Sequence, residues 1–309
     1  MESVKRTRDL YARKFYFGIN NKRKLHELDR EPSTSAPIAF EKPQSQTLSK
    51  SLDSEGKRFS KPLTESETPL VRFMPDYLNV EIEETISALA ETCLQGNNGF
   101  SSKHSTSSLN AHMHCYTWPC AAVMAQFIWH HRNVISGCTI LEISAGTGLP
   151  SIIAAKLGCR VIVSECDIQP WSSSVESAAV ACCRRNCERN GVSVKTVNLN
   201  WGQVNSAMLC LPPLDYVFLS DVLFFEKDFD RVFMTVRFFL ERFKCACYCS
   251  YQLRDEDWNL RLKSLCQRFS LKLIIVPLSS FDADKCDIAR SGLPGTVHSD
   301  IFLFKFELL

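Results

Sequence analysis

The stretch that decides the fold is ILEISAGTGLPSIIAAKLG, at residues 140–158. Its first part is a short apolar run that ends at Ser144, and Gly146 and Gly148 then make a turn. Pro150 follows, and proline is well placed at the start of a helix because it has no N–H to leave unpaired. A strand, a glycine turn and a helix in this order bring bare backbone close to a ligand at the carboxyl edge of a parallel sheet. The stretch therefore predicts a ligand-binding turn.

Two acidic residues indicate what kind of ligand this turn binds. Glu142 lies inside the strand before the turn, where an acid is unexpected for NAD and suits a ligand that carries an ammonium group. Glu165 ends the next strand-like run, 17 residues after Gly148, where a carboxylate can accept hydrogen bonds from two ribose hydroxyls. The dinucleotide fingerprint wants a third glycine at position 151, which is Ser151 here. The residues favour a nucleoside with an amino-acid tail, and the alternative is an ordinary turn beside a surface glutamate.

Outward from this turn, the chain alternates β-rich runs with helical patterns from about residue 116 onward. The seven strand-like runs are residues 139–144, 160–165, 194–199, 216–221, 246–251, 271–278 and 301–308. Helical periodicity occupies residues 175–182 and 229–243. Residues 279–295 resemble a loop, so the last two strands are predicted to pair antiparallel at the sheet edge. The pattern predicts an α/β fold, a seven-stranded Rossmann-like sheet with helices on both faces and an antiparallel edge strand.

Composition excludes several classes of protein. The chain has 309 residues, 45% of them hydrophobic, which suffices for a buried core. Thirty-six Lys and Arg against 34 Asp and Glu give a formal charge of +2, so no strong overall field attracts nucleic acid or membrane. The apolar runs fall far short of the roughly 20 residues that cross a bilayer, and the N-terminus lacks an apolar signal-peptide core. We expect a soluble intracellular protein.

The 15 cysteines are expected to be reduced thiols, and no metal site is expected. Three of them alternate as strand residues do and three follow a helical pattern, without the paired spacing of a zinc site: Cys245, Cys247 and Cys249; Cys182, Cys183 and Cys187.

The N-terminal region differs from the rest in charge and composition. Residues 1–30 hold nine Lys or Arg and four acids, and residues 31–70 hold eight Ser, four Thr and five Pro. Because so little apolar surface cannot offset the entropy of ordering, residues 1–70 are predicted to be a disordered tail. Its basic head is either a nucleic-acid arm or nuclear-import signal, or an ordinary solvated tail. Residues 71–115 are predicted to be an N-terminal extension, with a strand-like pattern at 71–84 and a helix-like one at 86–94, and residues 116–309 the main domain.

Several motifs resemble a known family. The run Glu142-x-Ser144-x-Gly146-x-Gly148, the acid Glu165 and the order of seven strands resemble class I S-adenosylmethionine-dependent methyltransferases. More narrowly, five segments resemble a methyltransferase-like family whose members modify protein lysines and, in one branch, arginine: residues 116–129, 199–202, 220–225, 250–258 and 277–288. The resemblance covers about residues 71–309. It departs at Ser144, where the family's turn has its first glycine.

The resemblance implies a map of the cofactor site. The residues implied to bind S-adenosylmethionine are Trp118, Glu142, Ser144, Gly146, Gly148, Glu165, Trp201 and Asp221. Trp118 would flank the methionine end of the cofactor, with the backbone around Ser144 and Gly146 beneath it. Glu165 would hold the ribose, and Trp201 would pack against the adenine.

The resemblance also implies where the methyl group is transferred. Asp221 begins the motif acid-x-x-aromatic, DVLF at 221–224, which lies at the methyl-transfer mouth in the family. Methyl transfer from a sulfonium is an in-line displacement that needs positioning rather than an enzyme nucleophile. A lysine is neutral at pH 7 only at a cost of about 4.6 kcal/mol, and an arginine costs more, so Asp221 is the predicted catalytic carboxylate. Glu226 is a second candidate, although Glu226 and Asp228 could equally be the acidic start of the next helix.

The implied function is that of a protein methyltransferase acting on arginine, histones included. The alternatives are a protein lysine methyltransferase and a non-catalytic adaptor that keeps the fold. The expected partners are a protein substrate and, in addition, chaperones or chromatin proteins, with no membrane and no direct nucleic-acid binding outside the basic tail. The expected location is the nucleus and the cytoplasm.

Overall fold

The structure is a computed structural model that describes residues 10–17, 78–85, 115–165, 178–253, 257–284 and 301–309. Its main sheet has seven strands in the spatial order β5-β4-β3-β6-β7-β9-β8. These strands are β3 (Thr139–Ile143), β4 (Arg160–Glu165), β5 (Lys195–Asn198), β6 (Tyr216–Ser220), β7 (Ala246–Gln252), β8 (Leu271–Val276) and β9 (Ile301–Leu308). All seven predicted strands are confirmed, each within two residues of its predicted ends.

Strand direction confirms the predicted antiparallel pairing and refines its place. β5, β4, β3, β6 and β7 pair in parallel, whereas β9 pairs antiparallel with both β7 and β8. β9 therefore lies one position in from the edge, and β8 is the edge strand. Every residue of β3 is buried, which is typical of a parallel strand covered on both faces. β5, at the opposite edge, is largely exposed.

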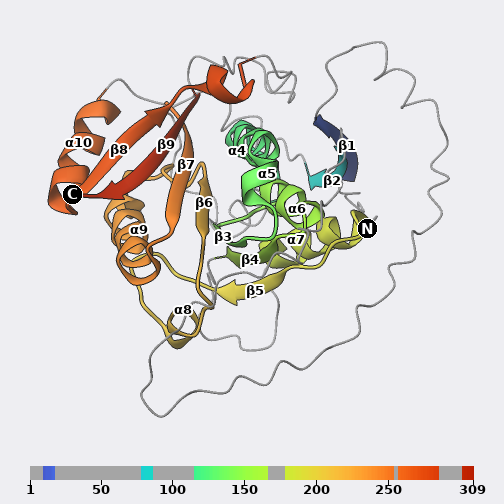
Figure 1. Cartoon of the computed structure of the whole chain (residues 1–309), viewed down its shortest axis with the longest axis horizontal. Coiled ribbons are helices and arrows are strands. Elements are labelled where there is room, and N and C mark those ends of the chain that lie inside the picture. The colour runs from blue at the N-terminus through green and yellow to red at the C-terminus, as the bar shows by residue number, and fades with distance from the viewer. Residues whose placement is uncertain (1–9, 18–77, 86–114, 166–177, 254–256, 285–300) are drawn as a thin grey trace, which may run out of the picture. The chain divides into compact units, whose positions relative to one another are not determined.

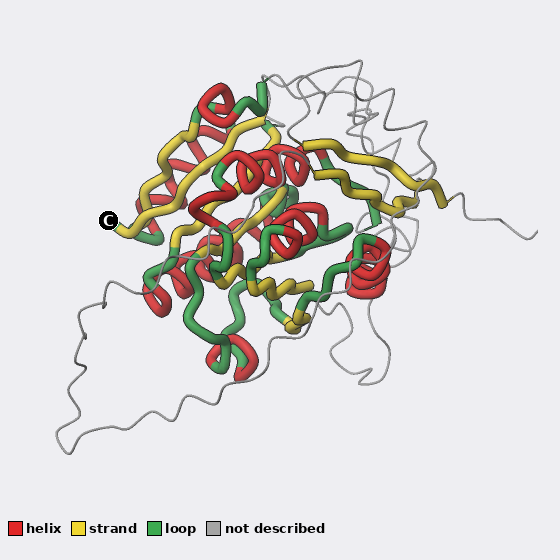
Figure 2. Tube along the Cα trace, turned by 45° about the vertical axis from the view of Figure 1, so that its right-hand side comes forward, coloured by secondary structure: helices red, strands yellow, loops and turns green. Residues whose placement is uncertain are grey.

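Helices cover both faces of this sheet (Figures 1 and 2). One face carries α4 (Pro119–His130), α6 (Leu149–Lys156) and α7 (Ala178–Arg189), and the other carries α9 (Phe229–Phe243) and α10 (Trp258–Arg268). The remaining helical segments are short: α5 (Arg132–Ile135), α8 (Ser206–Leu209), η1 (Glu226–Asp228) and η2 (Leu278–Phe281). In α9 the predicted apolar positions Phe229, Val232 and Phe233 are buried. The α/β class predicted from the sequence is thus confirmed.

A second, two-stranded sheet lies outside the predicted fold. β1 (Leu10–Phe17) pairs antiparallel with β2 (Leu78–Thr85) along its whole length. The prediction that residues 1–70 are a disordered tail is therefore wrong for these eight residues. Averaged composition concealed the aromatic run LYARKFYF, whose backbone groups find partners on a strand more than 60 residues away. The rest of 1–70, and the helix-like run at 86–94, lie outside the described residues.

β2 attaches this two-stranded sheet to helices α6 and α7. Val80 and Ile82 are buried, which is the alternation of a strand with one face against a core. The strand-like segment predicted in the extension is confirmed by β2.

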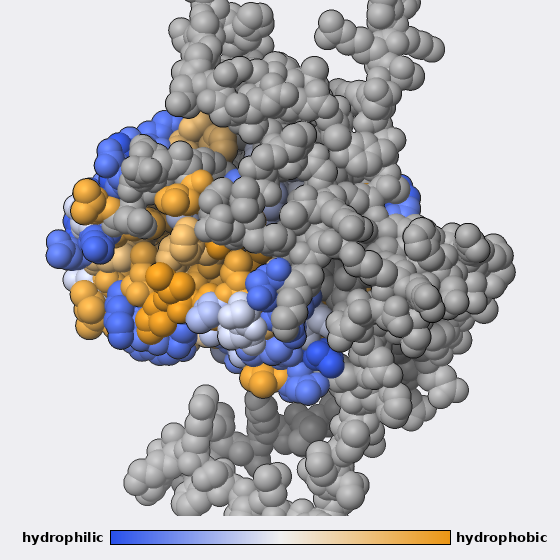
Figure 3. All heavy atoms as spheres, turned by 90° about the horizontal axis from the view of Figure 1, so that it is seen from above, coloured by the Kyte–Doolittle hydropathy of each residue, from blue (hydrophilic) through white to orange (hydrophobic). Residues whose placement is uncertain are grey.

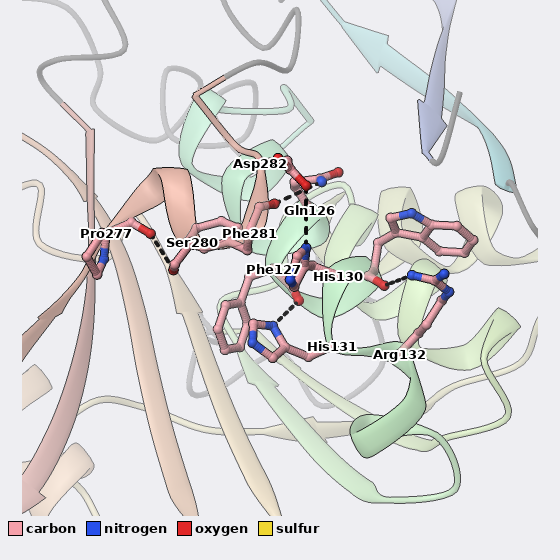
Figure 4. A network of polar contacts seen from close by, with 10 residues as sticks. Gln126, Phe127, His130, His131, Arg132, Pro277, Ser280, Phe281 and Asp282 are labelled. Atoms are coloured by element: carbon pink, nitrogen blue, oxygen red, sulfur yellow. Dashed lines mark hydrogen bonds and ion pairs between the residues drawn. The ribbon is translucent and has the colours of Figure 1, made fainter. Parts of the chain in front are cut away.

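Helix α4 is fixed to the main domain at both ends. Near its start, the hydroxyl of Ser250 on β7 donates to the Cys120 carbonyl at 2.8 Å. Near its end, Nε2 of Gln126 donates to the Phe281 carbonyl at 3.1 Å, and the ring of Phe127 lies edge-on to that of Phe281 (Figure 4). His130 and Asp282 face each other at 3.8 Å in the same network. These contacts fix α4, and with it the preceding Trp118, relative to the sheet.

The surface of the described part mixes polar and apolar side chains. On the face drawn in Figure 3, apolar residues form a patch bordered by hydrophilic ones. Most of the cysteines that the structure describes are buried. No helix in the described ranges combines the length and the apolar character needed to cross a membrane.

Candidate active site

The site lies where the strand order reverses at the centre of the sheet. β3 pairs with β4 on one side and with β6 on the other, so β4 and β5 build one half of the sheet and the strands from β6 onward build the other. In open α/β folds, ligands bind beyond the carboxyl ends of the strands at this switch point. The predicted residues follow these ends: the glycine turn follows β3, Glu165 ends β4, and Asp221 follows β6. The structure therefore brings together segments that are up to 80 residues apart in sequence.

The turn after β3 has an uncommon backbone. Ser144, Gly146 and Gly148 have φ angles of 57°, 56° and 80°, all in the left-handed region. Ser144 thus adopts the conformation that the family's glycine would take freely, and a non-glycine residue in such a conformation costs on the order of 1–3 kcal/mol. A Cβ at Gly148 would lie 2.6 Å from Sγ of Cys183 on α7, so this position requires glycine. The backbone therefore accommodates a serine at position 144, whereas close packing requires glycine at position 148.

Glu142 is a buried carboxylate beneath this turn. Its exposed fraction is 1%, and its Oε2 accepts hydrogen bonds from the backbone N–H of Ser151, at 3.0 Å, and from the Ser151 hydroxyl. Burial raises the pKa of Glu142 to about 8, although the bonds from Ser151 lower it and the nearby charge of Glu165 raises it. The serine that breaks the dinucleotide fingerprint is thus the group that holds the acid in place.

Glu165 is joined directly to the same turn. It is buried, and its Oε1 accepts a hydrogen bond from the backbone N–H of Gly146. The carboxylate at the end of β4 and the turn after β3 therefore form one unit. This arrangement brings Glu142, Gly146 and Glu165 together.

Aromatic residues and Asp221 gather beside the turn. Trp118 immediately precedes α4, and its ring centroid lies 5.4 Å from that of Tyr116 and 6.0 Å from that of Phe224. Asp221 has a φ of 56°, and its N–H donates to the Ser250 carbonyl at 2.8 Å. The start of α4 and the loop after β6, more than 100 residues apart in sequence, therefore lie side by side.

Trp201 lies on the loop after β5. It is partly buried against the main hydrophobic core, and its indole Nε1 is buried without a hydrogen-bond partner among the described residues. The loop is held by Gly202, whose N–H donates to the hydroxyl of Thr235 on α9 at 2.8 Å.

Glu226 and Asp228 each face an arginine of the chain itself. Glu226, on η1, forms an ion pair with Arg261 of α10 at 2.8 Å, and its side chain is 68% exposed. Asp228 faces Arg231 at 3.4 Å just before α9. Asp228 therefore has the position of the acidic helix start, and the catalytic role of Glu226 stays a prediction.

The sequence interpretation missed three polar residues that hold the turn. The hydroxyls of Thr117 and Thr147 are 2.8 Å apart, and Nδ2 of Asn186 on α7 donates to the Thr147 carbonyl at 3.1 Å. All three are at most 2% exposed. One signal could have identified Asn186, because it follows Cys182 by four residues on the apolar face of a helix, where a polar side chain needs a partner.

Unsatisfied atoms at the strand ends test whether a cofactor fits. Oε1 of Glu142, Nε1 of Trp201, Oγ of Ser164 and Oγ of Ser220 are buried and have no hydrogen-bond partner within the described part of the chain. Native proteins seldom leave such atoms unpaired unless a ligand or water supplies the partner. An ammonium group suits the carboxylate, and the oxygens and nitrogens of a nucleoside suit the donors. The residues present therefore fit S-adenosylmethionine.

The strand order, the glycine turn with its two buried acids and the loop after β6 define a class I S-adenosylmethionine-dependent methyltransferase. A family model described as lysine methyltransferase matches residues 104–267. The chain belongs to this family and is an S-adenosylmethionine-dependent methyltransferase of protein side chains.

Individual relatives agree with this family. The chain is 39% identical over 193 residues to the histone-arginine methyltransferase METTL23 of Homo sapiens, covering 62% of this chain and 97% of that protein. It is 41% identical over 189 residues to METTL23 of Xenopus laevis, covering 60% and 77%. It is also 26% identical over 155 residues to the protein N-lysine methyltransferase METTL21A of Danio rerio, covering 50% and 68%. The predicted family resemblance is confirmed.

Proposed function

We propose that this chain transfers a methyl group from S-adenosylmethionine to an arginine side chain of a protein, histones included. The observation that carries the proposal is a sequence identity of 39–41% to relatives named as histone-arginine methyltransferases, one of which is matched over 97% of its length. The identity to the N-lysine methyltransferase METTL21A is lower, at 26%.

We assign the cofactor roles as the sequence predicts them. Glu142 binds the ammonium group, and Glu165 binds the ribose while it accepts the N–H of Gly146. Trp201 packs against the adenine, and its buried indole N–H supports this role because it still has hydrogen-bonding capacity. Trp118 flanks the methionine end. When bound, S-adenosylmethionine supplies an electrophilic methyl group on a sulfonium sulfur.

Asp221 is the residue that we assign to the protein substrate. Its backbone is held by Ser250, and its neighbour Phe224 contacts Trp118, so the carboxylate belongs to a loop fixed from two sides. A carboxylate there attracts a cationic side chain, orients it and stabilises the positive charge until the proton is lost to solvent or to the carboxylate. Trp118 and Phe224 would line the approach and exclude water.

A lysine substrate is the second candidate, and two observations favour it. The matching family model is described as lysine methyltransferase. A guanidinium has five donors in a fixed fork and is served best by two carboxylates, whereas Glu226 and Asp228 already face Arg261 and Arg231. An arginine substrate would have to compete with Arg261 for Glu226, a surface pair worth only about 0–1 kcal/mol.

The test is to incubate the full chain with isotope-labelled S-adenosylmethionine and histones or cell extract, and to locate the label by mass spectrometry. Label on arginine supports the proposal. Label on lysine alone would refute the arginine assignment and leave the methyltransferase intact. Glu226→Gln then separates the two substrates further, because it should slow methylation of arginine and hardly affect that of lysine.

We also propose that the protein acts in the nucleus and the cytoplasm, and that chaperones or chromatin proteins are partners beside its substrate. The basic residues of the N-terminal head support a nuclear location. Imaging of the full chain against a variant with Lys22, Arg23 and Lys24 replaced by Ala tests this. An unchanged distribution would remove the basic head from the argument.

A further inference from the structure

We propose that Asn186 and Asn190 are positioning residues for the cofactor, through which the N-terminal strand β2 helps to fix the glycine turn after β3. Neither residue belongs to the predicted cofactor site. The inference concerns the turn that receives S-adenosylmethionine and does not depend on whether the methyl acceptor is arginine or lysine.

The first link joins β2 to the end of α7. Asn190 lies one residue beyond α7, and its Oδ1 accepts the backbone N–H of Glu81 at 3.1 Å. Its Nδ2 donates to the Glu81 carbonyl at 2.7 Å. One side chain thus satisfies both backbone groups of a residue in β2, as a neighbouring strand would. This two-way contact defines how β2 lies against α7.

The second link runs within the helix. Nδ2 of Asn190 also donates to the Asn186 carbonyl at 2.8 Å, and the backbone N–H of Asn190 points to the same carbonyl at 3.2 Å. The side chain and the backbone of Asn190 therefore both bind the Asn186 carbonyl at the C-terminal end of α7. Any displacement of β2 acts on the helix position that carries Asn186.

The third link joins α7 to the cofactor turn. Asn186 is fully buried, and its Nδ2 donates to the carbonyl of Thr147, which stands between Gly146 and Gly148. The Thr147 hydroxyl is in turn 2.8 Å from that of Thr117, the residue before Trp118. The chain of contacts therefore runs from β2 through the turn to the tryptophan at the predicted methionine end.

The turn needs such support because of its backbone. Three of its residues have φ angles between 56° and 80°, and one of them is Ser144. Strained segments of this kind persist only where the surroundings hold them. Asn186 holds the carbonyl side of the turn, while Glu165 holds the N–H of Gly146. A turn held on both sides is already close to its binding geometry, which reduces the ordering cost of binding.

The competing explanation is that Asn186 is only a satisfied buried amide whose loss destabilises the whole domain. The two explanations differ in what else changes. A positioning role alters the turn and the affinity for S-adenosylmethionine beyond what the loss of stability accounts for, whereas a purely structural role lowers the melting temperature alone.

The test uses the full chain with Asn186→Leu, Asn190→Asp and the control Arg189→Ala. The leucine keeps similar volume and removes the donor to Thr147. The aspartate keeps the acceptor for Glu81 and removes both donated bonds. The control breaks the Arg189–Glu81 ion pair, at 3.0 Å, which joins the same two elements, and leaves the amide contacts of Asn186 and Asn190 in place. Affinity for S-adenosylmethionine is measured by calorimetry, and amide hydrogen exchange at 144–148 is measured in the cofactor-free protein.

We expect the affinity for S-adenosylmethionine to fall about tenfold in Asn186→Leu and about threefold in Asn190→Asp, with faster exchange at 144–148 in both variants. In Arg189→Ala the affinity should change less than about twofold. Unchanged affinity and exchange in a folded Asn186→Leu variant would overturn the proposal. If that variant does not fold, Asn190→Asp decides: wild-type affinity together with faster exchange in β2 overturns the coupling. Because no protein substrate is used, neither result bears on the arginine assignment.

Discussion

At Glu142, burial and hydrogen bonding act on one carboxylate in opposite directions. Burial raises its pKa to about 8, and the two hydrogen bonds from Ser151 only partly compensate. The folded protein therefore binds this proton more tightly than the unfolded chain, whose carboxyl has the ordinary value of 4.5. The stabilising contribution of this proton is fully present below about pH 4.5 and is lost as the pH rises to about 8. A cationic cofactor group would reverse the effect, because it stabilises the ionised form.

Glu142→Gln should remove this pH dependence. The variant keeps an acceptor for Ser151 and cannot ionise. Between pH 5 and pH 8 the wild type should therefore lose free energy of unfolding relative to the variant, by at most about 1.4 kcal/mol per pH unit. Its affinity for S-adenosylmethionine should fall, because the charge opposite the ammonium group is gone. Urea denaturation at four pH values and calorimetric titration measure both effects. Parallel stability profiles would show that Glu142 is not the titrating group.

Asp221→Asn should separate chemistry from cofactor binding. Asparagine keeps the shape and tolerates the left-handed backbone at this position, so the loop should stay in place. The loss of charge should lower the methylation rate by roughly 10²-fold or more, with little change in affinity for S-adenosylmethionine. Single-turnover kinetics with labelled cofactor measure the rate. A variant that methylates at the wild-type rate would remove Asp221 from the chemistry.

At the scale of elements, the pairing of β1 with β2 is the feature that the sequence interpretation did not predict. β2 buries Val80 and Ile82, and contacts α6 and α7, the two helices that flank the cofactor turn. β1 gives it an edge partner over eight residues. A strand without a partner would expose its backbone groups to water, so β1 and β2 should be stable only when they are paired.

Deletion of residues 1–18 should therefore lower stability, whereas loss of a wholly disordered tail would leave stability unchanged. Loss of β1 removes the ladder along β2, and each kcal/mol lost should lower the melting temperature by roughly 2–4 °C. Affinity for S-adenosylmethionine should fall as well. Deletion of residues 1–9 is the matched control, because it leaves β1 intact. If the two deletions melt together, β1 does not contribute to stability.

At the scale of the whole molecule, the cofactor should stabilise the fold. It would join the carboxyl ends of β3, β4 and β6, and a ligand that binds only the native state adds about 2.7 kcal/mol at 100 times its Kd. S-adenosylmethionine should thus raise the melting temperature by several degrees, and NAD should leave it unchanged, because Ser151 replaces the third fingerprint glycine. Thermal scans with each ligand measure this. An equal shift with NAD would contradict the assigned ligand class.

The sequence alone determined the main sheet and its turn. Strand runs such as 139–144 and 301–308 have a local signal, because alternation and apolar runs depend only on neighbouring residues. The glycines at 146 and 148, and the acids at 142 and 165, occupy fixed distances along the chain, so their chemistry could be inferred before any contact was known.

Only the tertiary structure decided how these pieces are joined. The pairing of β1 with β2, the contact of Trp118 with Phe224, and the link from Asn190 through Asn186 to Thr147 connect residues that are distant in sequence. No local pattern encodes such contacts, because they depend on which helix faces pack together. The same reason explains Glu226, whose charge was visible in the sequence, whereas its partner Arg261 was set by the packing of α10 near η1.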